Sequence, residues 1–137
     1  MAACCTVMAR YSSIVCVGGV QANLGHYRRT IPALVAGGHT VYAVDLLGFG
    51  ASDKPGKSFA FSIDAWAQLV TEFTEQVVGA PVVLVGNSIG SLISLQAAAL
   101  DADAAGGQEA AAVRGVVLLN CAGGMNSKFI LELPDWR

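Results

Sequence analysis

Residues 81–100 read PVVLVGNSIGSLISLQAAAL, and this stretch decides how the chain folds. The run at 81–85 is short and apolar, which is typical of a strand buried in a sheet. The apolar pattern after residue 90 is longer and favours a helix. Between them lie five residues, GNSIG at 86–90, that leave room for only a tight turn. The stretch therefore predicts strand, turn and helix in that order.

The five residues of the turn match the pattern G-x-S-x-G. In this pattern the serine lies on a strained turn, and the positions two before and two after it pass too close for a side chain. Gly86, Asn87 and Gly90 are therefore the elbow residues. The turn lifts the hydroxyl of Ser88 above the sheet and makes it the candidate nucleophile. It also places the backbone N–H of Ile89 at a helix N-terminus, where it can stabilise an oxyanion.

Two other interpretations of this region are weaker. An ordinary helix start with a buried Ser88 hydroxyl would leave both glycines unexplained. Residues 76–100 contain no charged side chain, so they are long enough to span a membrane. They also contain a proline, three glycines and several serines, which interrupt a continuous helix. We therefore expect no membrane span.

Four short apolar runs predict buried strands, at residues 13–17, 40–46, 81–85 and 115–120. Helical patterns separate them, and this alternation predicts an α/β fold with a parallel sheet and right-handed crossovers. The composition agrees, because strands buried on both faces raise the apolar content, here 54 % against 13 % charged. Ligands of such sheets bind beyond the carboxyl ends of the strands. We therefore expect any chemistry at residues 18–21, 47–53, 86–90 and 121–126.

The clearest helical pattern spans residues 62–78. Ser62 is placed to accept a hydrogen bond as the N-cap, and Gly79 follows the last turn as a C-cap glycine does.

The remaining connections are expected to be shorter. Residues 26–36 predict two short helical pieces because Pro32 interrupts the pattern, with Thr30 capping the second piece. The Ala/Gly-rich stretch at 101–112 is expected to be a loop.

Charge and cysteine content exclude several functions. The net charge is −2 and no basic cluster extends beyond Arg28–Arg29, so nucleic-acid binding is not expected. The four cysteines show neither C-x-x-C spacing nor nearby histidine pairs, so no metal is expected. No nucleotide-binding or other cofactor motif is present either. Reduced thiols in the cytoplasm or in an organelle fit a chain with this much core.

Three segments, in chain order, resemble the α/β-hydrolase superfamily. Residues 41–55, VYAVDLLGFGASDKP, resemble the family's strand and following D-x-x-G-x-G-x-S-D loop. Residues 83–91, VLVGNSIGS, resemble its elbow, and residues 115–120, GVVLLN, resemble the strand after the elbow helix. The Gly-Asn-Ser elbow and the Leu-Leu-Asn strand end are similar to the plastid and cyanobacterial branch. That branch includes pheophytinase-like esterases, which remove phytol from chlorophyll breakdown products, and it implies a chloroplast location.

The resemblance implies a partial α/β-hydrolase fold over residues 12–137, after a short tail at 1–11. It implies about four parallel strands in the spatial order 2-1-3-4, with flanking helices. In that order the loop at 18–21 faces Ser88, and the backbone N–H of Val20 is the second oxyanion donor. The family usually has His-Gly after the first strand, where this chain has Gly18-Gly19-Val20-Gln21.

The family's triad runs Ser, then Asp or Glu, then His. The resemblance places the acid and the histidine after residue 120, where this chain has Glu132 and Asp135 but no histidine. We therefore expect the nucleophile half of the domain, without the lid or the C-terminal His segment, and without activity as this fragment. One hypothesis is a serine hydrolase for small-molecule carboxylic esters. The other is a non-catalytic truncated product, or an interaction module with an exposed sheet edge.

Other polar residues are expected to have structural roles. His26 is expected to pack or cap within its helix, and His39 to lie at the surface. The residues expected to shape the loop at 48–53 are Asp45, Ser52 and Asp53. Trp66 is expected to pack in the core. Asn120 is given no catalytic role, because its amide cannot stabilise an imidazolium by charge.

Overall fold

The computed structural model describes residues 4–7, 13–19, 24–56, 59–107 and 109–124. Its centre is a five-stranded sheet with the strand order β1-β3-β2-β4-β5. The strands are β1 (Cys4–Val7), β2 (Ser13–Val17), β3 (Thr40–Val44), β4 (Val82–Asn87) and β5 (Val113–Leu119). The strands β3, β2, β4 and β5 are neighbours in this spatial order, and each pair runs parallel. This is the predicted order 2-1-3-4, and the prediction of a partial α/β-hydrolase fold is confirmed.

The first strand was not predicted. Residues 4–7, expected as part of a tail, form β1 and pair antiparallel with β3. At the opposite side of the described sheet β5 is the last strand, and Val117, Leu118 and Leu119 are 40–44 % exposed there.

The register brings the carboxyl ends of the parallel strands to one edge. Val17, the last residue of β2, lies opposite Val44 and Gly86. Asn87, the last residue of β4, lies opposite Leu119. The segments that follow these strands therefore leave the sheet side by side, which is where the sequence predicts chemistry.

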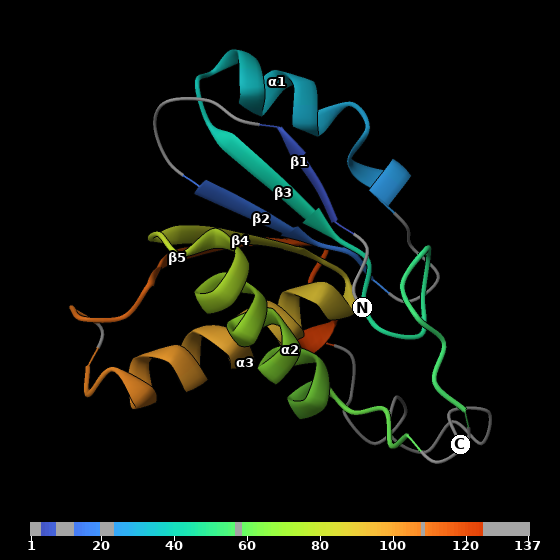
Figure 1. The fold of residues 1–137 in the computed structure, drawn as a ribbon, viewed down its shortest axis with the longest axis vertical. Coiled ribbons are helices and arrows are strands. Elements are labelled where there is room, and N and C mark those ends of the chain that lie inside the picture. Colours follow the sequence, from blue (N-terminus) through green and yellow to red (C-terminus); the bar gives the residue numbers. More distant parts are fainter. Residues whose placement is uncertain (1–3, 8–12, 20–23, 57–58, 108, 125–137) are drawn as a thin grey trace.

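Helices cover both faces of the sheet. They are η1 (Leu24–Tyr27), α1 (Thr30–Ala36), α2 (Ile63–Phe73), α3 (Ile89–Ala104) and two single turns, η2 (Thr74–Val78) and η3 (Ala122–Gly124). Figure 1 shows α1 on one face and α2 with α3 on the other. Within the described ranges, none of these helices has the length and apolar content needed to cross a bilayer.

Alternation along the strands divides the core into two layers. Val15 and Val17 of β2 pack on the α2–α3 side with Trp66, Val70 and Ile93. The intervening residues of β2 point to the α1 side, in a smaller cluster made by Ile14, Cys16, Tyr27, Val41, Ala43 and Val85. Strands buried on both faces account for the apolar runs in the sequence.

The predicted ends of the helix at 62–78 are confirmed. The Ser62 hydroxyl accepts a hydrogen bond from the backbone N–H of Ala65 at 3.1 Å. Gly79 ends the helix in the left-handed region at φ 58°, and its N–H donates to the Thr74 carbonyl at 2.9 Å. The last turn, η2, has the wider π-helical hydrogen bonding rather than α-helical hydrogen bonding.

Two other helix predictions were wrong in part. The two pieces around Pro32 are present, but the N-cap of α1 is Arg29 and no side chain caps the helix. Residues 101–104, expected as loop, continue α3. Alanine favours a helix, so Ala102 and Ala104 suit this extension. Asp101 ties this part of the helix to the start of β5, because its buried carboxylate accepts the backbone N–H of Val113 at 2.7 Å.

Candidate active site

Ser88 occupies the turn between β4 and α3 with φ 57° and ψ −122°. A positive φ is uncommon for a residue with a side chain and is a strained conformation. Gly86 and Gly90 make it sterically feasible. A Cβ on Gly86 would overlap the backbone carbonyl of Gly90, and a Cβ on Gly90 would overlap the carbonyl oxygens of Val17 and Gly18. Both positions therefore require glycine because another stretch of backbone passes too close for a side chain, as the sequence pattern predicts.

Hydrogen bonds from β5 and α3 hold this turn in place. The N–H of Ser88 donates to the Leu119 carbonyl at 2.9 Å, and the Ser88 carbonyl accepts from the N–H of Ser91 at 3.1 Å and of Ala122 at 3.3 Å. The fully buried hydroxyl of Ser91 donates to the Gly86 carbonyl at 2.8 Å and lies 3.2 Å from the Leu119 carbonyl. Sequence reasoning missed Ser91, because a serine one turn into a helix has no distinctive signature.

The segment after β2 reaches the elbow. A Cβ on Gly19 would lie 3.1 Å from both the Asn87 carbonyl oxygen and the Ser88 Cβ, so the Gly19 backbone borders the Ser88 side chain. Val20, predicted as an oxyanion donor, lies outside the described residues. Ile89 is the first residue of α3, and the N–H groups of a first helical turn have no acceptor within their own helix. Its role as an oxyanion donor stays a prediction.

Tyr27 lies under both strand ends. Its ring is 3 % exposed, and its hydroxyl contacts the Val17 carbonyl at 2.8 Å and the Val85 carbonyl at 3.3 Å. Burial raises the pKa of the phenol well above its usual range, and the neighbouring Cys16 thiol adds to the rise. The hydroxyl therefore keeps its proton and acts as a donor. Tyr27 carries no recognisable signal in the sequence, because its partners are backbone oxygens of distant residues.

The loop after β3 is built around Asp45, as predicted. The buried Asp45 carboxylate accepts the backbone N–H of Ala51 at 2.9 Å, and the Ser52 hydroxyl donates to the Asp45 carbonyl at 2.5 Å. Gly50 passes so close to the carboxylate that a side chain there would overlap it. The Asp53 carbonyl accepts the N–H of Gly48 at 2.8 Å.

An aromatic cluster supports the same loop. Trp66 is 2 % exposed and its indole N–H donates to the Leu47 carbonyl at 3.0 Å. The rings of Phe49 and Phe61 lie 5.8 and 5.7 Å from it. The packing role predicted for Trp66 is confirmed, and it also anchors the loop.

Neither histidine forms a described hydrogen bond with the Ser88 hydroxyl. His26 is exposed, and its ring lies in a T-shaped arrangement with the Tyr27 ring, with 6.3 Å between the ring centroids. His39 is half-buried rather than fully exposed, and it precedes β3 at the amino end of the sheet, opposite to the elbow. Asn120 follows β5 with φ 49° and an exposed side chain.

Two cysteine side chains are described, and both are free thiols. Burial raises the pKa of Cys16 from 9.0 to about 11, which makes its thiol a poor nucleophile. Cys121 is half-buried and accepts the N–H of Gly123 at 3.4 Å. Across the described ranges, no three His, Cys, Asp or Glu side chains come together as a metal site would need.

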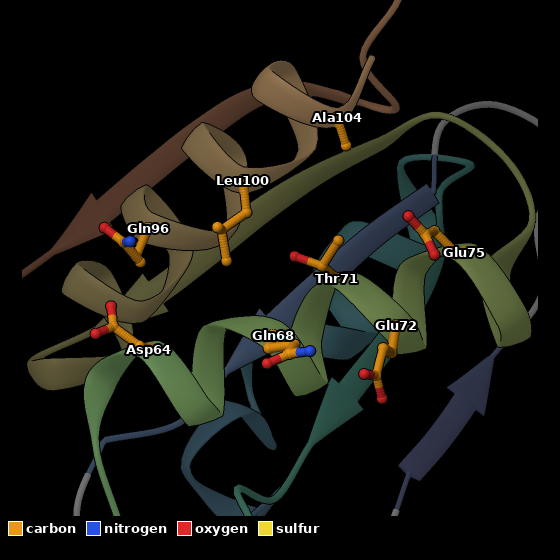
Figure 2. A pocket seen from close by; sticks show the side chains of 8 residues that line it. All are labelled: Asp64, Gln68, Thr71, Glu72, Glu75, Gln96, Leu100 and Ala104. Carbon is orange, nitrogen blue, oxygen red and sulfur yellow. The ribbon is translucent and has the colours of Figure 1, made fainter. Parts of the chain in front are cut away.

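A pocket of about 670 Å³ lies elsewhere, between α2 and α3 (Figure 2). Ser88 is not among its lining residues. The lining residues are Asp64, Gln68, Thr71, Glu72 and Glu75 of α2 and the neighbouring turn, and Gln96, Leu100 and Ala104 of α3.

Comparison with known proteins extends these observations. Residues 13–137 match the model of the alpha/beta hydrolase fold family. A haloalkane dehalogenase of Mycobacterium marinum is 41 % identical over 78 residues, which cover 57 % of this chain and 26 % of the dehalogenase. The chloroplastic pheophytinase of Arabidopsis thaliana is 38 % identical over 74 residues, covering 53 % of this chain and 14 % of that protein.

A solved structure shows the same arrangement. The crystal structure of a probable hydrolytic enzyme from Pseudomonas aeruginosa superimposes with a TM-score of 0.79 at 27 % identity, and the match covers 99 % of this chain and 41 % of that structure. The matched part is thus well under half of each of these proteins. The sheet order, the strained elbow and the family match lead to one conclusion: the chain belongs to the alpha/beta hydrolase fold family.

Proposed function

We propose that the elbow is the nucleophile half of a serine hydrolase site for carboxylic esters. The observation that carries the proposal is the Ser88 backbone, held at φ 57° between two glycines at the carboxyl edge of the sheet. A strained conformation persists only where the surrounding structure enforces it, and such positions cluster at functional sites. Here the enforcing groups come from three directions, namely β2, β5 and the first turn of α3.

The reaction proceeds by acyl transfer. The Ser88 oxygen attacks the acyl carbon as its proton passes to a base, and the N–H of Ile89, with that of Val20, stabilises the oxyanion. The alcohol then leaves with a proton, and water hydrolyses the acyl-enzyme. We propose that a histidine outside residues 1–137 supplies the base, because neither His26 nor His39 is hydrogen-bonded to Ser88. Acylation of this chain alone is therefore slow.

The chemistry of the hydroxyl favours esters over alkyl halides, although a haloalkane dehalogenase is among the relatives. Attack by Ser88 on a carbon that bears a halogen would release halide and leave a serine ether. Water does not cleave such an ether readily, so turnover would stop after one event. Attack on an acyl carbon gives a serine ester, which water does cleave. Of the two substrate classes, only esters allow Ser88 to complete a catalytic cycle.

The similarity to a chloroplastic pheophytinase supports a narrower form of the proposal. The whole protein would then act on the ester of a large hydrophobic alcohol, in a chloroplast. The Gly-Asn-Ser elbow and the 38 % identity carry this narrower form.

The test uses an activated acyl ester, p-nitrophenyl butyrate, and 1-bromobutane with the 137-residue chain. Peptide mass spectrometry then compares modification of Ser88 with that of Ser62, an exposed serine that caps α2. Added imidazole supplies a base in solution. We expect butyrylation of Ser88 at least about five-fold faster than of Ser62, and no Ser88 butyl ether. Equal rates at both serines, in a chain that remains folded, would contradict the proposal.

A further inference from the structure

We infer that Tyr27 is a positioning residue for the Ser88 site, and that its hydroxyl holds Gly19 in place against the nucleophile. The inference rests on the proposed function and deepens it. Tyr27 does not touch substrate in this account. It acts through the two strand ends from which the site is built.

The contacts of the hydroxyl carry the inference. It donates to the Val17 carbonyl at 2.8 Å and lies 3.3 Å from the Val85 carbonyl. Val17 is the last residue of β2, and Val85 directly precedes the first elbow glycine. One buried hydroxyl therefore bridges the strand that leads to Gly19 and the strand that leads to Ser88.

The bridge lies at the end of the pairing between β2 and β4. The pairing of β2 with β4 ends at Val17 opposite Gly86. Gly18 and Gly19 follow this last pair, and Gly19 borders the Ser88 Cβ. The same Val17 carbonyl faces Gly90, where a Cβ would overlap it. A small movement of this carbonyl would therefore change how the β2 end packs against the elbow.

Core packing alone does not account for a tyrosine here. The ring lies in an apolar cluster with Ile14, Cys16 and Val41, which a phenylalanine would fill equally well. Burial of a hydroxyl is unfavourable unless it is hydrogen-bonded. Its partners are the backbone oxygens of the two strands at the site, and this fits a role in fixing their separation.

The hydrogen bond also joins two elements that flank the site. It links Tyr27, the last residue of η1, to Val17, the last residue of β2, which directly precedes Gly18 and Gly19. A misplacement of about 1 Å in a group that borders the nucleophile can lower a rate about a hundred-fold.

The test compares Tyr27→Phe with a matched control, Tyr42→Phe. Tyr42 lies on β3 and packs its ring against Phe73 in the core layer on the opposite face. Reaction of Ser88 with a fluorophosphonate is followed at several probe concentrations with imidazole present. This separates the limiting rate constant from the half-saturating concentration. We expect Tyr27→Phe to lower the rate constant about ten-fold with the half-saturating concentration unchanged, and Tyr42→Phe to change neither.

Three results would overturn the inference. The first is a Tyr27→Phe chain that reacts at the unaltered rate. The second is an equal loss in Tyr42→Phe. The third is a Tyr27→Phe chain that does not fold, because the hydroxyl would then be required for stability and not for placement.

A separate readout distinguishes failure of the inference from failure of the proposed function. If the unaltered chain does not react at Ser88 at all, the proposed function fails. The amide NMR signals of Gly19 and Ser88 then decide whether Tyr27 positions them. Shifts of both signals in Tyr27→Phe, absent from Tyr42→Phe, support the inference, and unchanged signals overturn it.

Discussion

The N–H of Ser88 donates a 2.9 Å hydrogen bond to the carbonyl oxygen of Leu119, the last residue of β5. Ser88, the strained residue after β4, is thus held in place by the end of the neighbouring strand, β5. The Leu119 carbonyl also lies 3.2 Å from the Ser91 hydroxyl, so it contacts donors both within the elbow and in the first turn of α3. The elbow conformation therefore depends on β5 as well as on its own two glycines.

Replacement of Gly90 by alanine should strongly destabilise the fold. The added methyl group would overlap the carbonyl oxygens of Val17 and Gly18, and backbone atoms cannot move aside as a flexible side chain can. We expect a loss of about 3 kcal/mol or more in the free energy of unfolding, at the upper end for overpacked sites. Urea unfolding measures it.

Gly115→Ala is the matched control, because a Cβ there meets nothing within 4 Å. Its expected effect is within about 0.5 kcal/mol of zero. Similar losses in the two variants would show that the contact at Gly90 is not what requires glycine.

Two buried serines of α3 should respond in opposite ways to alanine. Ser91 and Ser94 are both fully buried, but only Ser91 has described hydrogen-bond partners, whereas the Ser94 hydroxyl has none. Ser91→Ala leaves a buried carbonyl without its donor and should cost about 1–2 kcal/mol. Ser94→Ala removes an unsatisfied hydroxyl and should be neutral or stabilising. Thermal unfolding of both variants measures the effects. A larger loss of stability for Ser94→Ala than for Ser91→Ala would contradict this prediction.

Asp101 should stabilise the junction between α3 and β5. Its carboxylate is 7 % exposed and accepts the N–H of Val113 at 2.7 Å. Asp101→Ala should cost about 1–3 kcal/mol, because the N–H of Val113 loses a charged acceptor. Asp103→Ala, at an exposed position on the same helix, is the control. Chemical denaturation of both variants gives the comparison, and a difference below about 0.5 kcal/mol would contradict the assignment.

Alkaline pH should destabilise the fold through Cys16. Burial raises its pKa from 9.0 to about 11, so the unfolded chain releases this proton at lower pH than the folded chain does. Above pH 9 the unfolded state binds fewer protons, and the free energy of unfolding falls with rising pH. The loss from Cys16 should reach about 1 kcal/mol by pH 10 and 2–3 kcal/mol above pH 11. Tyr27 adds to the loss at higher pH, since its pKa is raised from 10.0 as well.

Cys16→Ala should remove most of the loss between pH 8 and pH 10. Cys121→Ala, at a half-buried position, should keep it. The measurement is urea unfolding at both pH values. An unchanged pH dependence in Cys16→Ala would show that another group is responsible.

The strand order and the elbow could be predicted because their signals are local. An apolar run before G-x-S-x-G predicts a strand followed by a sharp turn. The two glycines indicate positions where the backbone passes too close to other backbone for a side chain. The strand at 4–7 could not be predicted in this way. A strand of four residues is too short to show a periodicity, and its partner, β3, lies far away in the sequence.

The supporting groups of the site were missed for a related reason. Tyr27 and Ser91 act on backbone carbonyls, which every residue carries, so no partner residue type marks them in the sequence. Residues 101–104 were assigned to a loop because the stretch is rich in Ala and Gly, although alanine itself favours a helix. The hydrogen bond between Asp101 and Val113 has no local signal in the sequence, because its partner is a backbone N–H twelve residues away.

The most direct test of the account is where a fluorophosphonate attaches to the folded chain. Peptide mass spectrometry after long exposure, with imidazole present, identifies the modified residue. The account predicts slow labelling that is confined to Ser88 and is absent in Ser88→Ala. Labelling that persists unchanged in Ser88→Ala, or that falls on other serines at the same rate, would contradict it.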